Sequence, residues 1–130
     1  MYPPHFLNFL LLIIISFTCS DPRTEQQLPQ YYYEYSAQEL TLLHEINVYR
    51  ENMSLNQLSE IQHISYRCHE HNMEMIADGF ASHVNFVTRT KNIMDVTGAT
   101  ELGENLAYNY QSMQSALSAW IASPDHQANL

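Results

Sequence analysis

Three ionisable side chains stand where predicted helices or strands begin and end: His83, Glu104 and His126. Residues at such boundaries can converge on one cleft from distant segments. Two imidazoles and one carboxylate would form an open three-ligand site for a divalent metal such as zinc, with a position left for water. The same trio could transfer protons without a metal, because imidazole titrates near neutral pH. The spacing alone favours a third interpretation, that these are three unrelated polar residues.

Several familiar catalytic signatures are missing from the sequence. The glycines of Gly98–Glu104 have the spacing of a P-loop, but Glu104 occupies the position of the phosphate-binding lysine. His44-Glu45 does not continue into the HExxH of zinc proteases, and no GxSxG turn occurs. His69 and His71 lie two residues apart on a predicted helix, so their side chains point to different faces and we expect both to be exposed.

Capping signals and hydrophobic spacing predict the elements that would position these side chains. Ser36 with Glu39, and Ser54 with Gln57, have the spacing of capping boxes at helix starts. A single strand cannot form a sheet, because its backbone groups need partners. The predicted elements are a helix over 36–52, a long helix from 54 to Gly79, a loop over 81–89, a helical turn over 93–96, a short strand within 102–108, and an amphipathic helix over 113–121 that stops at Ser123-Pro124.

The first residues indicate export. Residues 6–17 are apolar except for Asn8, and this run is too short to span a bilayer, so residues 1–19 are interpreted as a secretory signal peptide. No Lys or Arg precedes the run, which leaves an uncleaved anchor as the alternative. Cys19 follows it directly and would either be lipidated and attach the chain to a membrane, or be discarded with the signal. Both interpretations place the protein outside the cell or in the cell envelope.

Composition limits the partners. The chain has 130 residues, with 5 Lys+Arg and 14 Asp+Glu, which is enough for one domain and gives a net charge of -9. Because such an acidic surface would repel phosphate backbones, we expect no nucleic-acid partner. Residues 20–35 are polar, contain two prolines and are predicted to be a linker. Its tyrosines, from Tyr31 onward, could stack on a sugar, but packing on the domain is favoured.

Five short motifs occur in order between Leu40 and Leu130, and together they resemble the CAP (SCP) superfamily, in particular its compact bacterial, secreted members. The most specific is Gly103-Glu104-Asn105-Leu106-Ala107, which matches the family's GEN-[LIV]-A. The sequence departs from the family at Cys68, where Ala is usual, and at Asp125, where Gly is usual. The other motifs are Asn47-x-x-Arg50, Leu58 with Cys68-x-x-His71-x-x-x-Met75, His83-x-x-Phe86-x-x-Arg89, and Trp120-x-x-Ser123-Pro124-Asp125-His126-x-x-Asn129-Leu130.

The resemblance implies an α+β fold in which helices cover both faces of a small antiparallel sheet, an αβα sandwich. Family members continue beyond the last motif into a β-hairpin that completes the sheet. We therefore expect the CAP domain, residues 36–130, to be incomplete at its C-terminus and to consist mainly of helices. We also expect its cavity to be only partly enclosed.

The resemblance also implies that His83, Glu104 and His126 line a cavity that binds a divalent metal, usually discussed as zinc. A second cavity glutamate of many eukaryotic members corresponds to Ser123 here, so we expect a triad rather than a tetrad. Asn105, Trp120 and Asn129 are expected to hold the fold rather than to take part in chemistry.

Three functions follow from these observations. The first is an exported CAP-domain protein of unknown biochemical role with a metal-binding His/Glu/His cavity. The second is a module that binds a lipid, cell-wall or protein ligand without catalysis, and the third is a non-functional truncated paralogue. Non-enzymatic functions are favoured, because the sequence offers no nucleophile with an adjacent base and a fold does not define a function.

Overall fold

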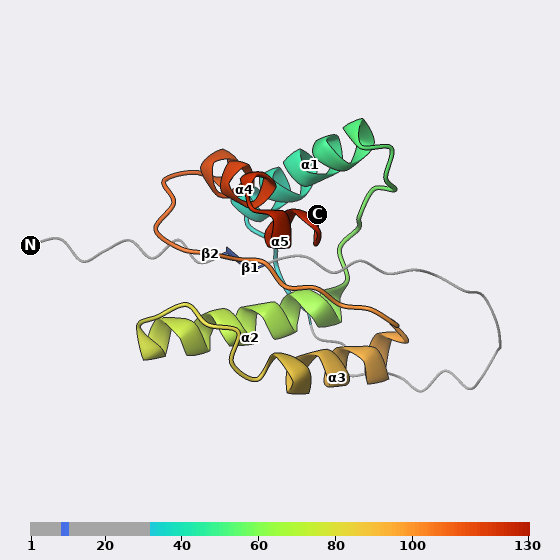
Figure 1. The fold of residues 1–130 in the computed structure, drawn as a ribbon. Coiled ribbons are helices and arrows are strands. Elements are labelled where there is room, and N and C mark those ends of the chain that lie inside the picture. Colours follow the sequence, from blue (N-terminus) through green and yellow to red (C-terminus); the bar gives the residue numbers. More distant parts are fainter. Residues whose placement is uncertain (1–8, 11–31) are drawn as a thin grey trace, which may run out of the picture.

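Five helices account for most of residues 9–10 and 32–130, the part of the chain that the computed structural model describes (Figure 1). None of these helices is long and apolar enough to cross a membrane. Cys19 and all but two residues of the predicted signal peptide lie outside the described residues. The elements are β1 (Phe9–Leu10), α1 (Ala37–Asn52), α2 (Gln62–Asp78), α3 (Phe86–Thr97), β2 (Leu106–Ala107), α4 (Met113–Ala122) and α5 (Pro124–Gln127).

The apolar core lies where α1 packs against α4. Helix α1 begins as predicted, because the Ser36 hydroxyl accepts the Glu39 N–H while the Glu39 carboxylate accepts the Ser36 N–H. Helix α4 also matches its prediction and ends before Pro124. The core cluster comprises Leu42, Ile46, Ala107, Met113, Ala116, Leu117, Trp120 and Leu130.

Helix α2 starts later than its sequence predicts. The box at Ser54 does not open a helix, and residues 55–61 have no regular structure. The reason is a competing contact: the Asn47 side chain donates to the Leu58 carbonyl at 2.9 Å and accepts the Leu58 N–H at 2.7 Å. The predicted end of the helix is confirmed, since Gly79 caps it in the left-handed conformation at φ 77°.

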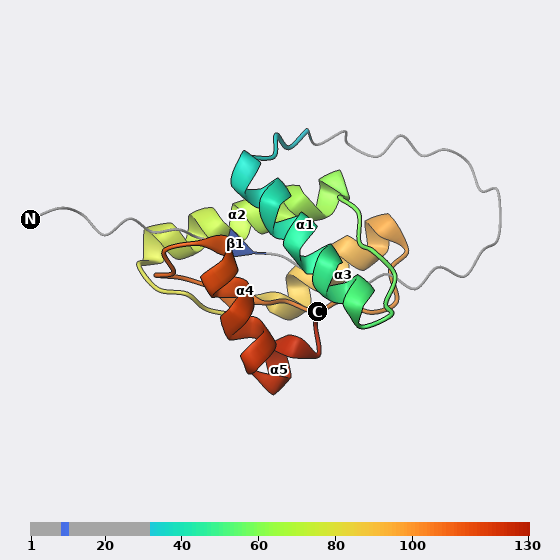
Figure 2. The ribbon, with the colours of Figure 1, turned by 90° about the horizontal axis from the view of Figure 1, so that it is seen from above.

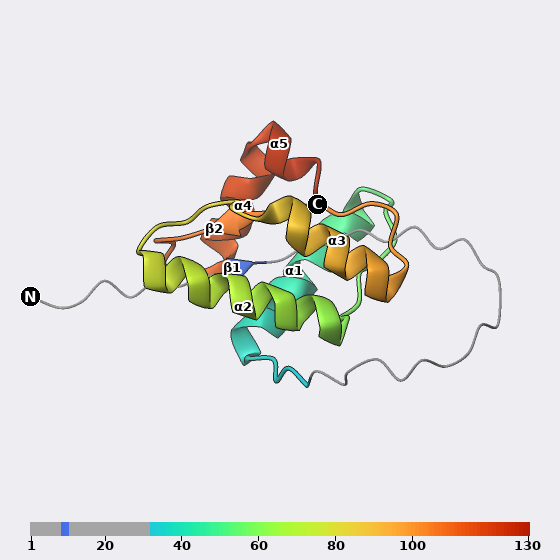
Figure 3. The same cartoon turned by 90° about the horizontal axis from the view of Figure 1, so that it is seen from below.

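The helices form two layers with the extended segments between them (Figure 1). Helices α1, α4 and α5 make up one layer, whereas α2 and α3 lie together in the other, as the perpendicular views also show (Figures 2 and 3). Between the layers β1 pairs antiparallel with β2, with Phe9 opposite Ala107 and Leu10 opposite Leu106. Within the described residues, strand structure is limited to this pair. The expectation of a mostly helical domain is confirmed. The αβα sandwich stays a prediction, because a pair of two-residue strands is too small to form its central layer.

The tyrosine-rich segment before α1 packs on the domain, which agrees with the favoured interpretation. Tyr33 and Tyr35 meet edge to face, with ring centroids 5.2 Å apart, and the Tyr35 hydroxyl lies 2.7 Å from the Ser65 hydroxyl on α2. The Tyr33 ring also lies against His69. Tyr32 is exposed, and Tyr31 lies outside the described residues. The segment therefore joins the start of α1 to α2.

Candidate functional site

His83 and Glu104 are in direct contact, although 21 positions separate them in the sequence. His83 stands in the loop between α2 and α3, and its Nδ1 lies 2.7 Å from Glu104 Oε1 in the segment before β2. A carboxylate only accepts hydrogen bonds, so Nδ1 carries the proton of this pair. The Glu104 side chain is 8% exposed and that of His83 54% exposed. The structure thus brings together two of the three predicted site residues.

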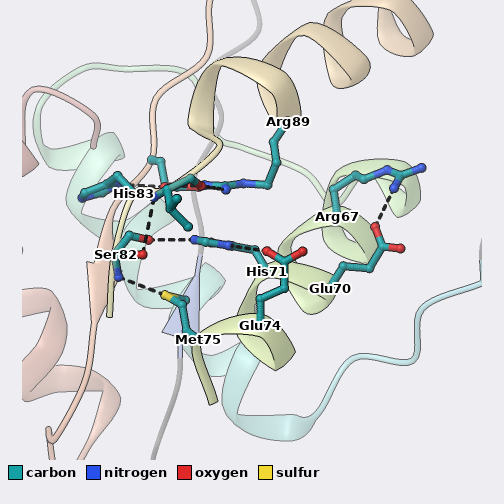
Figure 4. Close-up of polar contacts among 10 residues, drawn as sticks. Arg67, Glu70, His71, Glu74, Met75, Ser82, His83 and Arg89 are labelled. Carbon is teal, nitrogen blue, oxygen red and sulfur yellow. Dashed lines mark hydrogen bonds and ion pairs between the residues drawn. The ribbon is translucent and has the colours of Figure 1, made fainter. Parts of the chain in front are cut away.

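Arg89 is the third member of this contact. From the first turn of α3, its Nη2 donates to both carboxylate oxygens of Glu104, at 2.8 and 2.6 Å, and its Nη1 donates to the Val84 carbonyl. Figure 4 shows Arg89 reaching from α3 towards His83. Sequence reasoning missed this role, although Arg89 was the final residue of the His83-x-x-Phe86-x-x-Arg89 motif. The guanidinium neutralises the carboxylate and occupies both of its oxygens.

His126 approaches the same segment through its backbone. The side chain of Asn105, the residue after Glu104, donates to the His126 carbonyl at 2.9 Å. The His126 ring is half-buried, and its Nδ1 lies 2.7 Å from the Ser123 hydroxyl one turn earlier. Two adjacent residues therefore contact the two histidines. Glu104 contacts the ring of His83, and Asn105 contacts the backbone carbonyl of His126.

Close packing fixes the segment that carries Glu104. A Cβ atom on Gly103 would lie 2.5 Å from Asn129 Oδ1, so only glycine fits without displacing that side chain. Asn129 is itself held, because its Nδ2 donates to Asn105 Oδ1 at 3.0 Å. The Trp120 indole donates to the Leu106 carbonyl at 2.9 Å. Asn105, Trp120 and Asn129 thus make the fold-holding contacts expected of them.

The donor atoms left over at the site decide what it could bind. Nδ1 of both His83 and His126 is engaged, whereas neither Nε2 has a hydrogen-bond partner within residues 32–130. Cys68 is a poor candidate ligand, because burial, with a smaller contribution from the Glu104 charge, raises the pKa of its thiol to about 12. Within the described residues, no group of three or more His, Cys, Asp or Glu is placed to hold a metal ion. The three-ligand zinc site stays a prediction.

His71 is buried, and the expectation that it is solvent-exposed is wrong. Its side chain is 0% exposed, because α2 turns this face towards the loop that leads into α3. His69, on another face of α2, is exposed as predicted. The sequence held a signal for this difference, since His71 follows Ile64 and precedes Met75 at helical spacing, and both of those residues are buried.

Comparisons of the chain with protein-family models, with curated proteins and with solved structures gave no match.

Proposed function

We propose that the chain is an exported CAP-domain protein that binds a divalent metal, with zinc as the best candidate, through Nε2 of His83 and Nε2 of His126. The single observation that carries this proposal is the contact of two adjacent residues with the two histidines: Glu104 with the His83 ring and Asn105 with the His126 backbone. On this proposal β2 belongs to the central layer of an αβα sandwich.

The contacts of Glu104 favour a supporting role over direct coordination. Metal-binding histidines usually donate their second ring N–H to a carboxylate, which fixes the tautomer and makes the free nitrogen a better donor. The pair of His83 Nδ1 and Glu104 Oε1 has this arrangement. Both Glu104 oxygens already accept hydrogen bonds from Arg89. Glu104 would therefore hold and polarise His83, while Ser123 holds the ring of His126.

Zinc suits the remaining donor set. Imidazole nitrogen is a preferred zinc ligand, and two protein ligands would leave positions for water or for a bound molecule. A bound zinc ion would supply a Lewis acid at this site. The net charge of -9 favours cations near the chain. The Ser123 hydroxyl does lie 2.7 Å from His126 Nδ1, but within residues 32–130 no carboxylate contacts the other nitrogen of that ring to orient it as a base, so a binding function is favoured over catalysis.

Titration calorimetry with zinc tests the proposal. The unmodified chain should bind zinc, and the double variant His83→Ala/His126→Ala should lose at least about 100-fold in affinity, because both ligands are gone. His44→Ala/His69→Ala removes the same number of imidazoles from exposed positions and should bind like the unmodified chain. Equal affinity in the two double variants would show that zinc binds elsewhere.

One observation favours a second candidate, a module that binds a lipid or another apolar ligand. Five large apolar side chains on α2, on the following loop and on the start of α3 are exposed: Met73, Ile76, Phe80, Val84 and Val87. Such exposure is typical of contact surfaces. Vesicle or ligand binding that survives in His83→Ala/His126→Ala would support this candidate over the metal site.

A further inference from the structure

The buried ring of His71 holds the backbone next to His83. Its Nε2 lies 2.8 Å from the carbonyl oxygen of Ser82, the residue that precedes His83 (Figure 4). A carbonyl oxygen only accepts, so Nε2 must carry a proton. The Ser82 N–H is held as well, by the Met75 sulfur on α2 at 3.4 Å. Both backbone groups of Ser82 are thus anchored to α2.

Three successive residues of this loop are each held by a different ionisable side chain. His71 holds the Ser82 carbonyl, Glu104 holds the ring of His83, and Arg89 holds the Val84 carbonyl. These three residues lie outside any helix or strand. A loop without a hydrogen-bond ladder takes its position from such contacts, and of the three side chains only that of His71 is completely inaccessible to solvent.

We propose that His71 is a positioning residue for His83, which it places so that His83 Nδ1 meets Glu104 and Nε2 is presented to a metal. The presentation of Nε2 and the zinc readout rest on the proposed metal-binding function, whereas the placement of His83 against Glu104 does not. The His71–Ser82 bond and the His83–Glu104 pair are described contacts that do not require a metal.

Glu74 contacts the other side of the His71 ring but is not needed for this role. Its carboxylate lies 3.2 Å from Nδ1 and its side chain is 56% exposed. Because a carboxylate also only accepts, that contact is a hydrogen bond only when Nδ1 is protonated too. A ring without the Nδ1 proton would still donate the Nε2 hydrogen bond to the Ser82 carbonyl. Glu74→Ala is therefore a matched control.

The test measures the ring nitrogens of His71 and His83 by NMR in the metal-free full chain, and zinc affinity by calorimetry. His71→Phe should remove the spectral signature of the hydrogen-bonded His83 Nδ1 and lower zinc affinity about 10-fold, as loss of a supporting contact does. His71→Gln, whose amide can donate to the Ser82 carbonyl, should restore most of both. Glu74→Ala should change neither.

The outcomes separate the two proposals. If His71→Phe folds and leaves the His83 signals unchanged, the positioning role is overturned. If the unmodified chain binds no zinc, the proposed function fails, but the His83 signals still decide the role of His71. If His71→Phe does not fold, the unmodified chain decides, because a His71 ring with its proton on Nδ1 and a bare Nε2 would contradict the inference.

Discussion

Replacing Glu104 by alanine should lower the free energy of unfolding by about 3 kcal/mol and weaken zinc binding about 10- to 100-fold. The carboxylate is 8% exposed and faces the Arg89 guanidinium, which is 13% exposed. Its removal would leave a largely buried cation without its partner and would release the His83 ring. Denaturant unfolding and zinc calorimetry on the same samples measure the two effects.

Two further variants separate charge from shape. Glu104→Gln keeps an oxygen for Arg89 but loses the negative charge, so it should fall between the unmodified chain and Glu104→Ala. Glu101→Ala removes an exposed carboxylate three residues earlier and should change stability by less than about 0.5 kcal/mol. If Glu104→Ala were as stable as Glu101→Ala, the contacts with Arg89 and His83 would not support the fold.

Replacing Asn105 by alanine should cost about 3 kcal/mol in the free energy of unfolding. Its side chain is 0% exposed and joins the β2 segment to the C-terminal residues through the His126 carbonyl and the Asn129 amide. Alanine would leave both groups without this partner and create a cavity. For a domain of this size, the melting temperature should fall by roughly 10–20 °C.

Matched asparagine variants check that the effect comes from this network. Asn129→Ala removes the hydrogen bond to Asn105 and the packing on Gly103, and it should cost less because the His126 carbonyl keeps its donor. Asn52→Ala, at the exposed end of α1, should be close to neutral. Equal melting temperatures for Asn105→Ala and Asn52→Ala would contradict the role given to Asn105.

The elements that could be predicted from the sequence are those whose signals are local. The capping box at Ser36, the apolar spacing of α4, the stop before Pro124 and the cap at Gly79 act within a turn or two of chain. The helical turn predicted over 93–96 is part of the longer helix α3, and the loop predicted over 81–89 ends where that helix begins. The helix begins at Phe86 after Asn85, whose positive φ of 58° interrupts the chain without a clear sequence signal.

Contacts between distant residues account for what could not be predicted. The start of α2 was wrong because Asn47, on the preceding helix, holds the backbone of Leu58. The spacing of His71 with Ile64 and Met75 indicates the buried face of α2, but its polar partner, the Ser82 carbonyl in the following loop, has no signal in the sequence. In both cases a partner 11 residues away decides the outcome.

The candidate site shows the same division. Residue type and position at element ends indicate His83, Glu104 and His126 as site residues. The first two are in contact in the structure. The role of Arg89 at the site could not be predicted, because it depends on a contact with Glu104, which lies 15 positions further along the chain. Nor could the sequence separate a metal ligand from a carboxylate that supports one, since this depends on which oxygens are already engaged.

Thermal unfolding of the full chain, with zinc and with a chelator, tests the central claim most directly. A ligand that binds only the native state stabilises it by about 2.7 kcal/mol at 100 times its dissociation constant. We therefore predict a cooperative transition that is roughly 10 °C higher with zinc than with chelator. A cooperative transition at the same temperature in both solutions would contradict a metal site built on His83 and His126.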